Sequence, residues 1–216
     1  NAQTLMRAGF IEKISAGVYA YLPLGLRVFQ KIEAIIRQEM ANLGAQEVEL
    51  PSLTPEEPWQ QTGRLTAFDI LFKTAGSDKK QYILAPTHEE IITPLVKKFV
   101  QSYRDLPLGV YQIQTKFRNE LRVKSGLLRG REFTMKDLYS FHLNQEDLNA
   151  YYLVVQKAYF QIFKRCGLLE KTYLTFASGG AFSQYSHEFQ TVTEVGEDTI
   201  FICEDCNLAI NKEIIK

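Results

Sequence analysis

The sequence predicts an α+β fold in which a mainly antiparallel sheet is flanked by helices. Residues 110–122 alternate between polar and apolar side chains, and residues 131–141 resume as a second strand after a short turn. This pattern is typical of an antiparallel hairpin. Helical patterns precede and follow the hairpin at 26–43 and 145–165, without the regular strand–helix alternation of a doubly wound fold. A chain of 216 residues can hold one large domain or two small ones.

The first third of the chain predicts a strand or hairpin, then a helix. Residues 14–25 are typical of a short strand or hairpin that ends in a turn at Pro23 and Gly25. The following helix has a natural stop at Gly44. Its apolar side chains fall on one face: Val28, Ile32, Ile35, Ile36 and Leu43.

Two short strands and a loop are expected before the hairpin. Residues 46–51 alternate and are closed by Pro51, so they predict a strand, and residues 81–86 predict another. Residues 54–66 have the character of a loop.

The remaining elements follow the hairpin. A helix is expected at 145–165, ended by Gly167. A strand is expected at 173–180, and one or two more within 186–206.

Composition limits the classes of function. The chain has 25 basic and 25 acidic residues, which argues against a surface coated for non-specific DNA binding. Its three cysteines are too few and too scattered for a disulfide scaffold and favour a reducing compartment. The uncharged run from Ile14 to Leu26 is too short to span a bilayer, and no signal peptide is visible. Because the chain starts at Asn1, we expect it to be a piece of a longer protein.

One side of the predicted hairpin is unusually basic. Residues 115–137 hold seven basic and three acidic residues, although the chain as a whole has no net charge. Arg118 and Arg122 flank Glu120, while Arg129 and Arg131 return with the second strand. Guanidinium groups on a rigid sheet suit phosphate or carboxylate binding, although a polar sheet face can also simply be solvated. The pattern alone leaves both interpretations open.

Two further motifs each have a structural and a functional interpretation. In "PTHEE" (86–90), Thr87 and Glu90 fit a helix capping box, whereas Thr87 and Glu89 together could hold a cationic amine. In "YSHEF" (185–189), His187 is more often a structural residue than a binding one when the pattern is taken alone.

The cysteines do not form a complete metal site. Cys203 and Cys206 make one C-x-x-C, but a structural zinc needs four ligands and Cys166 is distant. We therefore expect no zinc from this chain alone, and half a zinc ribbon completed after Lys216 stays open as an alternative. The sequence also lacks the P-loop and the dinucleotide fingerprint.

Four segments in the right order resemble the bacterial-type prolyl-tRNA synthetases, a family of class II aminoacyl-tRNA synthetases. Residues 15–33, with the strand ending at Pro51, resemble motif 1, and "PTHEE" resembles the proline-recognition loop. Residues 111–142 resemble motif 2, and 186–206 resemble the segment that leads into an inserted domain. The resemblance covers nearly the whole chain.

The resemblance implies a class II catalytic-domain-like fold that is incomplete in this chain. It implies a catalytic core over residues 1–195 and the start of the segment leading to an inserted domain over 196–216. Motif 3, with its G-x-G-x-x-R, and the anticodon-binding domain are not expected in the chain, so the fragment alone should be inactive.

The resemblance also implies roles for individual residues. Arg118 would be the catalytic residue, because it matches the arginine that clamps the ATP α-phosphate and the substrate carboxylate. The implied ATP-binding residues are Arg118, Glu120, Arg129 and Phe133. The implied proline-binding residues are Thr87, Glu89, Arg118, Met135 and His187.

The implied activity is proline–tRNA ligation in the cytoplasm. Proline would react with ATP, supplied with Mg²⁺, to give prolyl-adenylate, and the prolyl group would pass to tRNA(Pro). No metal ligand is assigned in the protein, no membrane association is expected, and the motif 1 region is expected to form a homodimer.

The sequence departs from the family pattern next to the expected pocket. Ser183, Gln184 and Tyr185 stand where the family often has small residues, so the detailed shape of that pocket does not follow from the resemblance. The alternatives are a threonine or serine synthetase, a non-catalytic synthetase-like module that binds tRNA or protein, and a zinc-ribbon binding module.

Overall fold

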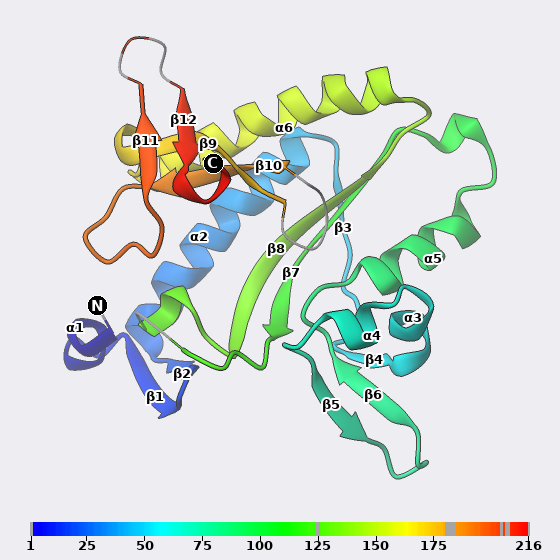
Figure 1. Cartoon of the computed structure of the whole chain (residues 1–216), viewed down its shortest axis with the longest axis horizontal. Helices are drawn as coiled ribbons and strands as arrows, with labels where there is room; N and C mark the ends of the chain where they lie inside the picture. The colour runs from blue at the N-terminus through cyan, green and yellow to red at the C-terminus, as the bar shows by residue number, and fades with distance from the viewer. Residues whose placement is uncertain (1, 124–125, 180–184, 204, 206–207, 216) are drawn as a thin grey trace. The chain divides into compact units, whose positions relative to one another are not determined.

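A computed structural model describes residues 2–123, 126–179, 185–203, 205 and 208–215 of the chain. Helices and antiparallel sheets are mixed as the sequence predicts, which confirms the α+β class (Figure 1). The chain forms two compact units, Asn1–Val155 (unit 1) and Gln156–Lys216 (unit 2). Within the described residues, 3₁₀ turns connect larger elements at Tyr103–Asp105, Gly126–Leu128 and Leu169–Lys171, and another follows the last strand at Lys212–Ile214.

A long hairpin organises unit 1. Strands β7 (Leu108–Phe117) and β8 (Glu132–Phe141) run antiparallel side by side, and β3 (Gln46–Glu47) joins β7 in parallel (Figure 1). Directly paired residues of an antiparallel ladder project from the same side of the sheet. The register therefore places three polar residues of β7 and their partners on β8 on one side, here called the site face: Gln112 with Asp137, Gln114 with Met135, and Lys116 with Phe133.

The hairpin ends its first strand earlier than predicted, and it decides against one of the two interpretations of its polar side. The first strand ends at Phe117 and does not continue to Arg122, because Glu120 N–H donates to the Arg118 carbonyl in a tight turn (2.7 Å). The polar side is also not a solvated face, since Gln112 and Lys116 are 0% exposed. Alternation identified the two sides of the strand correctly, and Gln112 and Lys116 on the polar side are enclosed.

The N-terminal part of unit 1 is a helix, a hairpin and a long helix. These are α1 (Ala2–Arg7), β1 (Ile11–Ser15), β2 (Val18–Tyr21) and α2 (Pro23–Asn42). The predicted turn at Pro23 and Gly25 is wrong: Pro23 is the first residue of α2, a position that suits its fixed φ and missing N–H. Gly44 adopts φ +73° just beyond the helix, which confirms the predicted stop.

The turn between β1 and β2 contacts the segment that leads into β8. The carbonyl of Gly17 accepts from the backbone N–H of Arg131 (2.8 Å) and of Glu132 (3.3 Å). Gly17 has φ +77°, and a Cβ there would lie 2.5 Å from a methyl carbon of Val123. Only glycine meets both requirements without strain.

A second small sheet carries the region that was predicted as a loop. Strands β4 (Leu53–Pro55), β6 (Gln81–Leu84) and β5 (Phe72–Ala75) pair antiparallel, and two short helices, α3 (Glu56–Gln61) and α4 (Arg64–Ala67), follow β4. The loop prediction for 54–66 is therefore wrong. These helices are too short for periodicity to show; they are held by burial of Trp59, whose indole donates to the Thr54 hydroxyl (3.1 Å).

Helix α5 (Glu89–Phe99) completes unit 1. It contains Pro94 and packs two residues one turn apart, Ile92 and Val96, against Leu50 and Val110 of the core. Among the described residues, no helix is both long enough and apolar enough to cross a membrane.

Unit 2 is built on the second part of α6 (Gln145–Arg165), whose bounds match the prediction. Its sheet has the order β10 (Tyr185–Thr191), β9 (Thr172–Ser178), β12 (Ala209–Asn211) and β11 (Ile200–Ile202). Phe189 of β10 packs against three aromatic residues of the helix, Tyr159, Phe160 and Phe163. The predicted strand at 173–180 and two strands within 186–206 are confirmed, and β12 was not foreseen.

Candidate active site

Two distant segments of unit 1 meet at the end of β7. The N–H of Phe117 donates to the carbonyl of Ala85 (3.0 Å), so the chain after β6 runs beside the strand end. The next residue, Arg118, directs Nε and Nη2 at the carbonyl of Pro86, each at 3.4 Å. The "PTHEE" segment is therefore fixed next to the arginine that the sequence singled out.

Thr87 and Glu89 contact each other directly. The Thr87 hydroxyl donates to Oε2 of Glu89, and Thr87 is buried while the Glu89 side chain is 35% exposed. The capping-box interpretation of this segment is wrong, because α5 begins at Glu89 and His88 stands at its N-cap without a side-chain cap. Glu90 instead accepts from Arg64 Nη1 (2.8 Å) and from the Thr62 hydroxyl (3.1 Å).

The Arg118 guanidinium lies over the ring of Phe133, 5.4 Å from its centroid. A carbonyl oxygen and an aromatic face stabilise a cation without neutralising it. The positive charge therefore stays available for an anionic group. The structure thus brings together four predicted site residues: Thr87, Glu89, Arg118 and Phe133.

Glu120 and Arg129 form an ion pair with each other. Arg129 Nε donates to Glu120 Oε2 at 3.1 Å; the glutamate side chain is 13% exposed and the arginine 51%. Arg131 Nε donates to the backbone carbonyl of Glu120 (3.1 Å), which fixes the turn after Arg118. The pairing keeps both residues near Arg118, and their roles toward ATP stay predictions.

The last two predicted site residues lie on different units. Met135 is half-buried on β8, opposite Gln114 on the site face. His187 belongs to β10 of unit 2, where its ring lies 4.7 Å from that of Phe176. Its role in a proline pocket stays a prediction. Ser183 and Gln184 lie outside the described residues, and Tyr185 is described only as the start of β10.

His88 belongs to a buried polar network that the sequence analysis missed. Its Nε2 lies 3.1 Å from the Pro51 carbonyl, which can only accept, so Nε2 carries the hydrogen. Nδ1 then accepts, and it faces two donors, Gln112 Nε2 at 3.0 Å and Lys116 Nζ. Burial, followed by the nearby Lys116 charge, lowers the pKa of His88 to about 4. The imidazole is therefore neutral at pH 7.

Asp137 is the acceptor at the other end of this network. Its Oδ2 receives hydrogen bonds from Lys116 Nζ (2.8 Å), Gln112 Nε2 (2.9 Å) and the Tyr139 hydroxyl (3.0 Å). Burial lowers the pKa of Lys116, and attraction to Asp137 opposes that shift. Burial, reinforced by the Asp137 charge, raises the pKa of Tyr139. The sequence does carry a signal for this network, because glutamine and lysine occupy alternate positions of one predicted strand.

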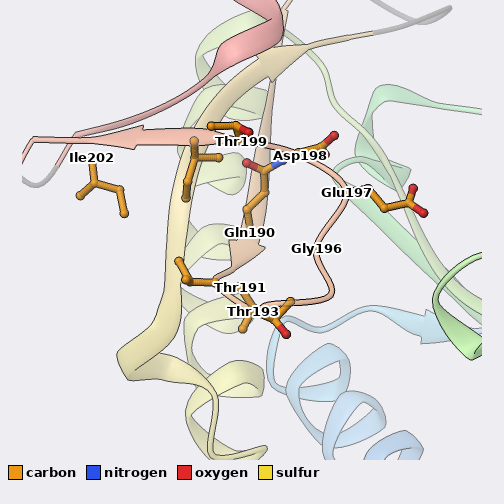
Figure 2. A pocket seen from close by; sticks show the side chains of 10 residues that line it. Gln190, Thr191, Thr193, Gly196, Glu197, Asp198, Thr199 and Ile202 are labelled. Atoms are coloured by element: carbon orange, nitrogen blue, oxygen red, sulfur yellow. Dashed lines mark hydrogen bonds between the residues drawn. The ribbon is translucent and has the colours of Figure 1, made fainter. Parts of the chain in front are cut away.

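Unit 2 has hollows of its own. Residues from β10, β11 and the segment between them surround a hollow of about 420 Å³ (Figure 2). Beside it, Gln190 Nε2 donates to Glu188 (2.9 Å) and Asp198 (3.3 Å). Burial raises the pKa of Glu188, and the charges of Glu213 and Asp198 add to the shift. A second hollow, of about 560 Å³, is lined partly by His187.

One of the two cysteines of the C-x-x-C belongs to the described residues. Cys203 is exposed, while Cys206 lies outside the described residues. Within the residues that the structure does describe, no three histidine, cysteine, aspartate or glutamate side chains gather as a metal-binding group.

Sequence comparison identifies the class of protein. The family model described as "tRNA synthetase class II core domain (G, H, P, S and T)" matches residues 72–210. The chain therefore belongs to the class II tRNA synthetase core-domain family.

Similar curated proteins include proline–tRNA ligases. A proline–tRNA ligase from Moorella thermoacetica is 50% identical over 213 residues, and one from Dehalococcoides mccartyi is 49% identical over 212. Each alignment covers 98% of this chain but only 37% of the relative, so the chain spans little more than a third of these proteins. The resemblance to prolyl-tRNA synthetases is thereby confirmed.

Solved structures confirm the class II catalytic-domain fold. Giardia lamblia prolyl-tRNA synthetase in complex with prolyl-adenylate has a TM-score of 0.70 and 24% identity, covering 76% of this chain and 35% of that one. Prolyl-tRNA synthetase from Cryptosporidium parvum, complexed with L-proline and AMP, has a TM-score of 0.72 and 20% identity, covering 83% and 36%.

Proposed function

We propose that the protein to which this chain belongs is a proline–tRNA ligase. The observation that carries the proposal is the meeting of Arg118 with the Thr87–Glu89 pair at the end of β7. A guanidinium for a carboxylate and a carboxylate for a cationic nitrogen are the two charges that an amino-acid zwitterion requires. The high identity to proline–tRNA ligases supports proline as that amino acid.

The proposed reaction needs no nucleophile from the protein. The proline carboxylate oxygen forms a bond to the α-phosphorus of ATP, and the bond from that phosphorus to pyrophosphate breaks. Arg118 contacts both reacting groups and stabilises the charge that develops between them. Glu89, oriented by the Thr87 hydroxyl, holds the imino nitrogen. Met135 and His187 are assigned to the walls of the proline pocket.

ATP, carried as its Mg²⁺ complex, is the second substrate. Phe133 is assigned to stack on adenine and Glu120 to lie at the adenine end of the site. Arg129, assigned to the outer phosphates, is more exposed than its partner Glu120 and can exchange that carboxylate for a phosphate. Such an exchange keeps the guanidinium charge paired throughout.

The proposal also covers the tRNA, the cellular compartment and the oligomeric state. The prolyl group would pass to the terminal adenosine of tRNA(Pro), and the protein would act in the cytoplasm, where translation takes place. A homodimer through the α2 region is part of the proposal. It is supported by the exposure of three apolar residues on that helix: Leu24, Val28 and Ile32.

ATP–pyrophosphate exchange by the full-length protein tests the proposal. We expect proline to support exchange and the other amino acids to support little. Exchange with threonine or serine but not with proline would assign the protein to another class II synthetase. No exchange with any amino acid would favour a non-catalytic synthetase-like binding module.

A further inference from the structure

Lys116 is the charged residue that the site face encloses most completely. Its side chain is 0% exposed, and it belongs to β7, two positions before Arg118, which follows the end of that strand. The ammonium contacts two acceptors, Asp137 Oδ2 at 2.8 Å and the neutral Nδ1 of His88. Burying a lysine costs free energy of folding, even when it is paired in this way. The position of Lys116 next to the candidate site therefore calls for an explanation.

The contacts of Lys116 connect the two segments that carry the amino-acid site. His88 lies between Thr87 and Glu89, while Lys116 belongs to β7, which ends one residue before Arg118. The ammonium therefore ties the residue at the centre of the "THE" triplet to β7. This contact complements the backbone bond from Phe117 to Ala85 and the Arg118 contact with Pro86.

The ion pair also sets the charge around Glu89. Lys116 and Asp137 cancel each other, which leaves Glu89 and Arg118 as one negative and one positive group for the substrate. Without Lys116, Asp137 and Glu89 would both lose a cation on which the charge of each of them acts. Carboxylates that share a site resist being ionised together.

We propose that Lys116, paired with Asp137, is a positioning residue for amino-acid binding. It holds His88, and with it Thr87 and Glu89, against β7, and its charge compensates that of Asp137. This inference rests on the proposed function, because Glu89 must bind the cationic nitrogen of the amino acid.

Several charged or titratable groups from neighbouring elements bear on Glu89. Arg64 of α4 lies 3.5 Å from it, and Lys116 of β7 and Tyr139 of β8 both sense its charge. Asp137 in turn is faced by Lys116, Tyr139 and His88. Arg64 also pairs with Glu90, so it is shared between two carboxylates. Lys116 is therefore the cation that compensates Asp137.

The test compares Lys116→Met with Lys116→Met/Asp137→Asn in the full-length protein. For each variant, the KM for proline in pyrophosphate exchange is measured between about pH 6 and pH 8.5, a window chosen to reveal a raised carboxyl pKa. In the wild type the KM should be flat. In Lys116→Met the KM should rise about 3-fold at pH 6 and recover toward alkaline pH, because a carboxyl pKa raised by about two units from its usual value of about 4.3 leaves that carboxyl mostly protonated at pH 6.

The double variant separates charge from structure. Asparagine keeps an oxygen for Gln112 and Tyr139 but removes the uncompensated charge, so the KM profile should become flat again. A KM in Lys116→Met that equals the wild-type value at every pH, or a KM that depends on pH as strongly in the double variant as in the single one, would overturn the proposal. If Lys116→Met does not fold, Asp137→Asn is the single variant to which the double variant is compared. The double variant should then have a lower KM for proline than Asp137→Asn.

A matched control and the wild-type assay complete the design. Lys97→Met makes the same chemical change at an exposed position of α5, and its KM profile should equal that of the wild type. Absence of proline exchange by the wild type would overturn the proposed function together with this inference. An active wild type with an unchanged pH profile in Lys116→Met would overturn the inference alone.

Discussion

At the scale of single residues, Glu89 and Glu90 are chemically identical neighbours in different environments. Glu89 is partly exposed and bonded to Thr87, whereas the Glu90 side chain is 0% exposed and bonded to Arg64. Only Glu89 is therefore accessible to a substrate cation. A single sequence cannot separate the two, because the difference depends on Arg64, which reaches them from α4.

Arg118→Ala should lower adenylate formation by on the order of 10²-fold or more, the range for losing one charge-stabilising donor. Pyrophosphate exchange by the full-length protein measures it. Arg104→Ala is the matched control, because Arg104 lies in an exposed 3₁₀ turn over the ring of Tyr103. An exchange rate that does not change in Arg118→Ala would show that the anion-site assignment is wrong.

His88 should make stability depend on pH. Folding lowers its pKa from 6.5 to about 4, so the unfolded chain binds the proton more readily between these values. The contribution of His88 is therefore complete above about pH 6.5 and is lost as the pH falls toward 4, by at most on the order of 3 kcal/mol.

Urea denaturation of the wild type and of His88→Asn at several pH values checks this expectation. The slope with pH is diagnostic, because absolute stability also changes when hydrogen bonds are removed. Equal slopes in both proteins would contradict a neutral buried imidazole. NMR of the ring should show no titration of His88 near neutral pH.

At the scale of elements, sequence periodicity predicted the long helices and strands. It missed the short helices that tertiary contacts stabilise. The bounds of α6 and β8 follow from long amphipathic or alternating patterns. By contrast, α3 and α4 are single turns or little more, and they are held by the burial of Trp59. Polar residues enclosed by long-range partners, such as Lys116, could not be distinguished from solvated ones.

The residues of the candidate site were predicted better than the buried polar network next to them. Thr87, Glu89, Arg118 and Phe133 were identified through motif resemblance, and the structure brings them together. The His88 network was missed, because its partners are 24 to 37 residues away in the sequence.

The side chain of Gln114 makes the two hydrogen bonds to the Leu50 backbone that a neighbouring strand would otherwise make. Its amide accepts from the N–H of Leu50 (2.9 Å) and donates to the carbonyl of the same residue (2.6 Å). Gln114→Ala should destabilise the protein by about 2 kcal/mol, because two backbone groups lose their partner. Thermal denaturation measures the loss, and hydrogen exchange at the Leu50 amide locates it.

An exposed glutamine provides the control for this substitution. Gln60 bonds only across one helical turn to Glu56, so Gln60→Ala should change stability little. Retained protection of the Leu50 amide in Gln114→Ala would contradict the assignment.

At the scale of the whole molecule, helix α2 leaves apolar residues uncovered. Val28 is 46% exposed and Ile32 42%, although both belong to the apolar face that the periodicity identified. The helix buries only Gly25, Glu39 and Met40. A second copy of the chain would cover this face, in agreement with the proposed homodimer.

Val28→Glu/Ile32→Glu should convert the full-length dimer into monomers, because two charges would be buried at the interface. Sedimentation velocity distinguishes the two states. Gln30→Glu places a charge on the opposite side of the same helix and should leave the dimer intact. A wild type that sediments as a monomer would rule out the dimer itself.

The contact at Gly17 has a consequence for how substitutions in this protein should be interpreted. The carbonyl of Gly17 supports the chain at Arg131 and Glu132, just after the segment that carries Glu120 and Arg129. Any side chain at position 17 would be strained by φ +77° and would meet Val123 and the Arg131 backbone. Intolerance to change at this position would resemble that of a substrate-binding residue, although its origin is purely architectural. Mutational sensitivity near the N-terminus thus reports on the geometry of a loop more than a hundred residues later.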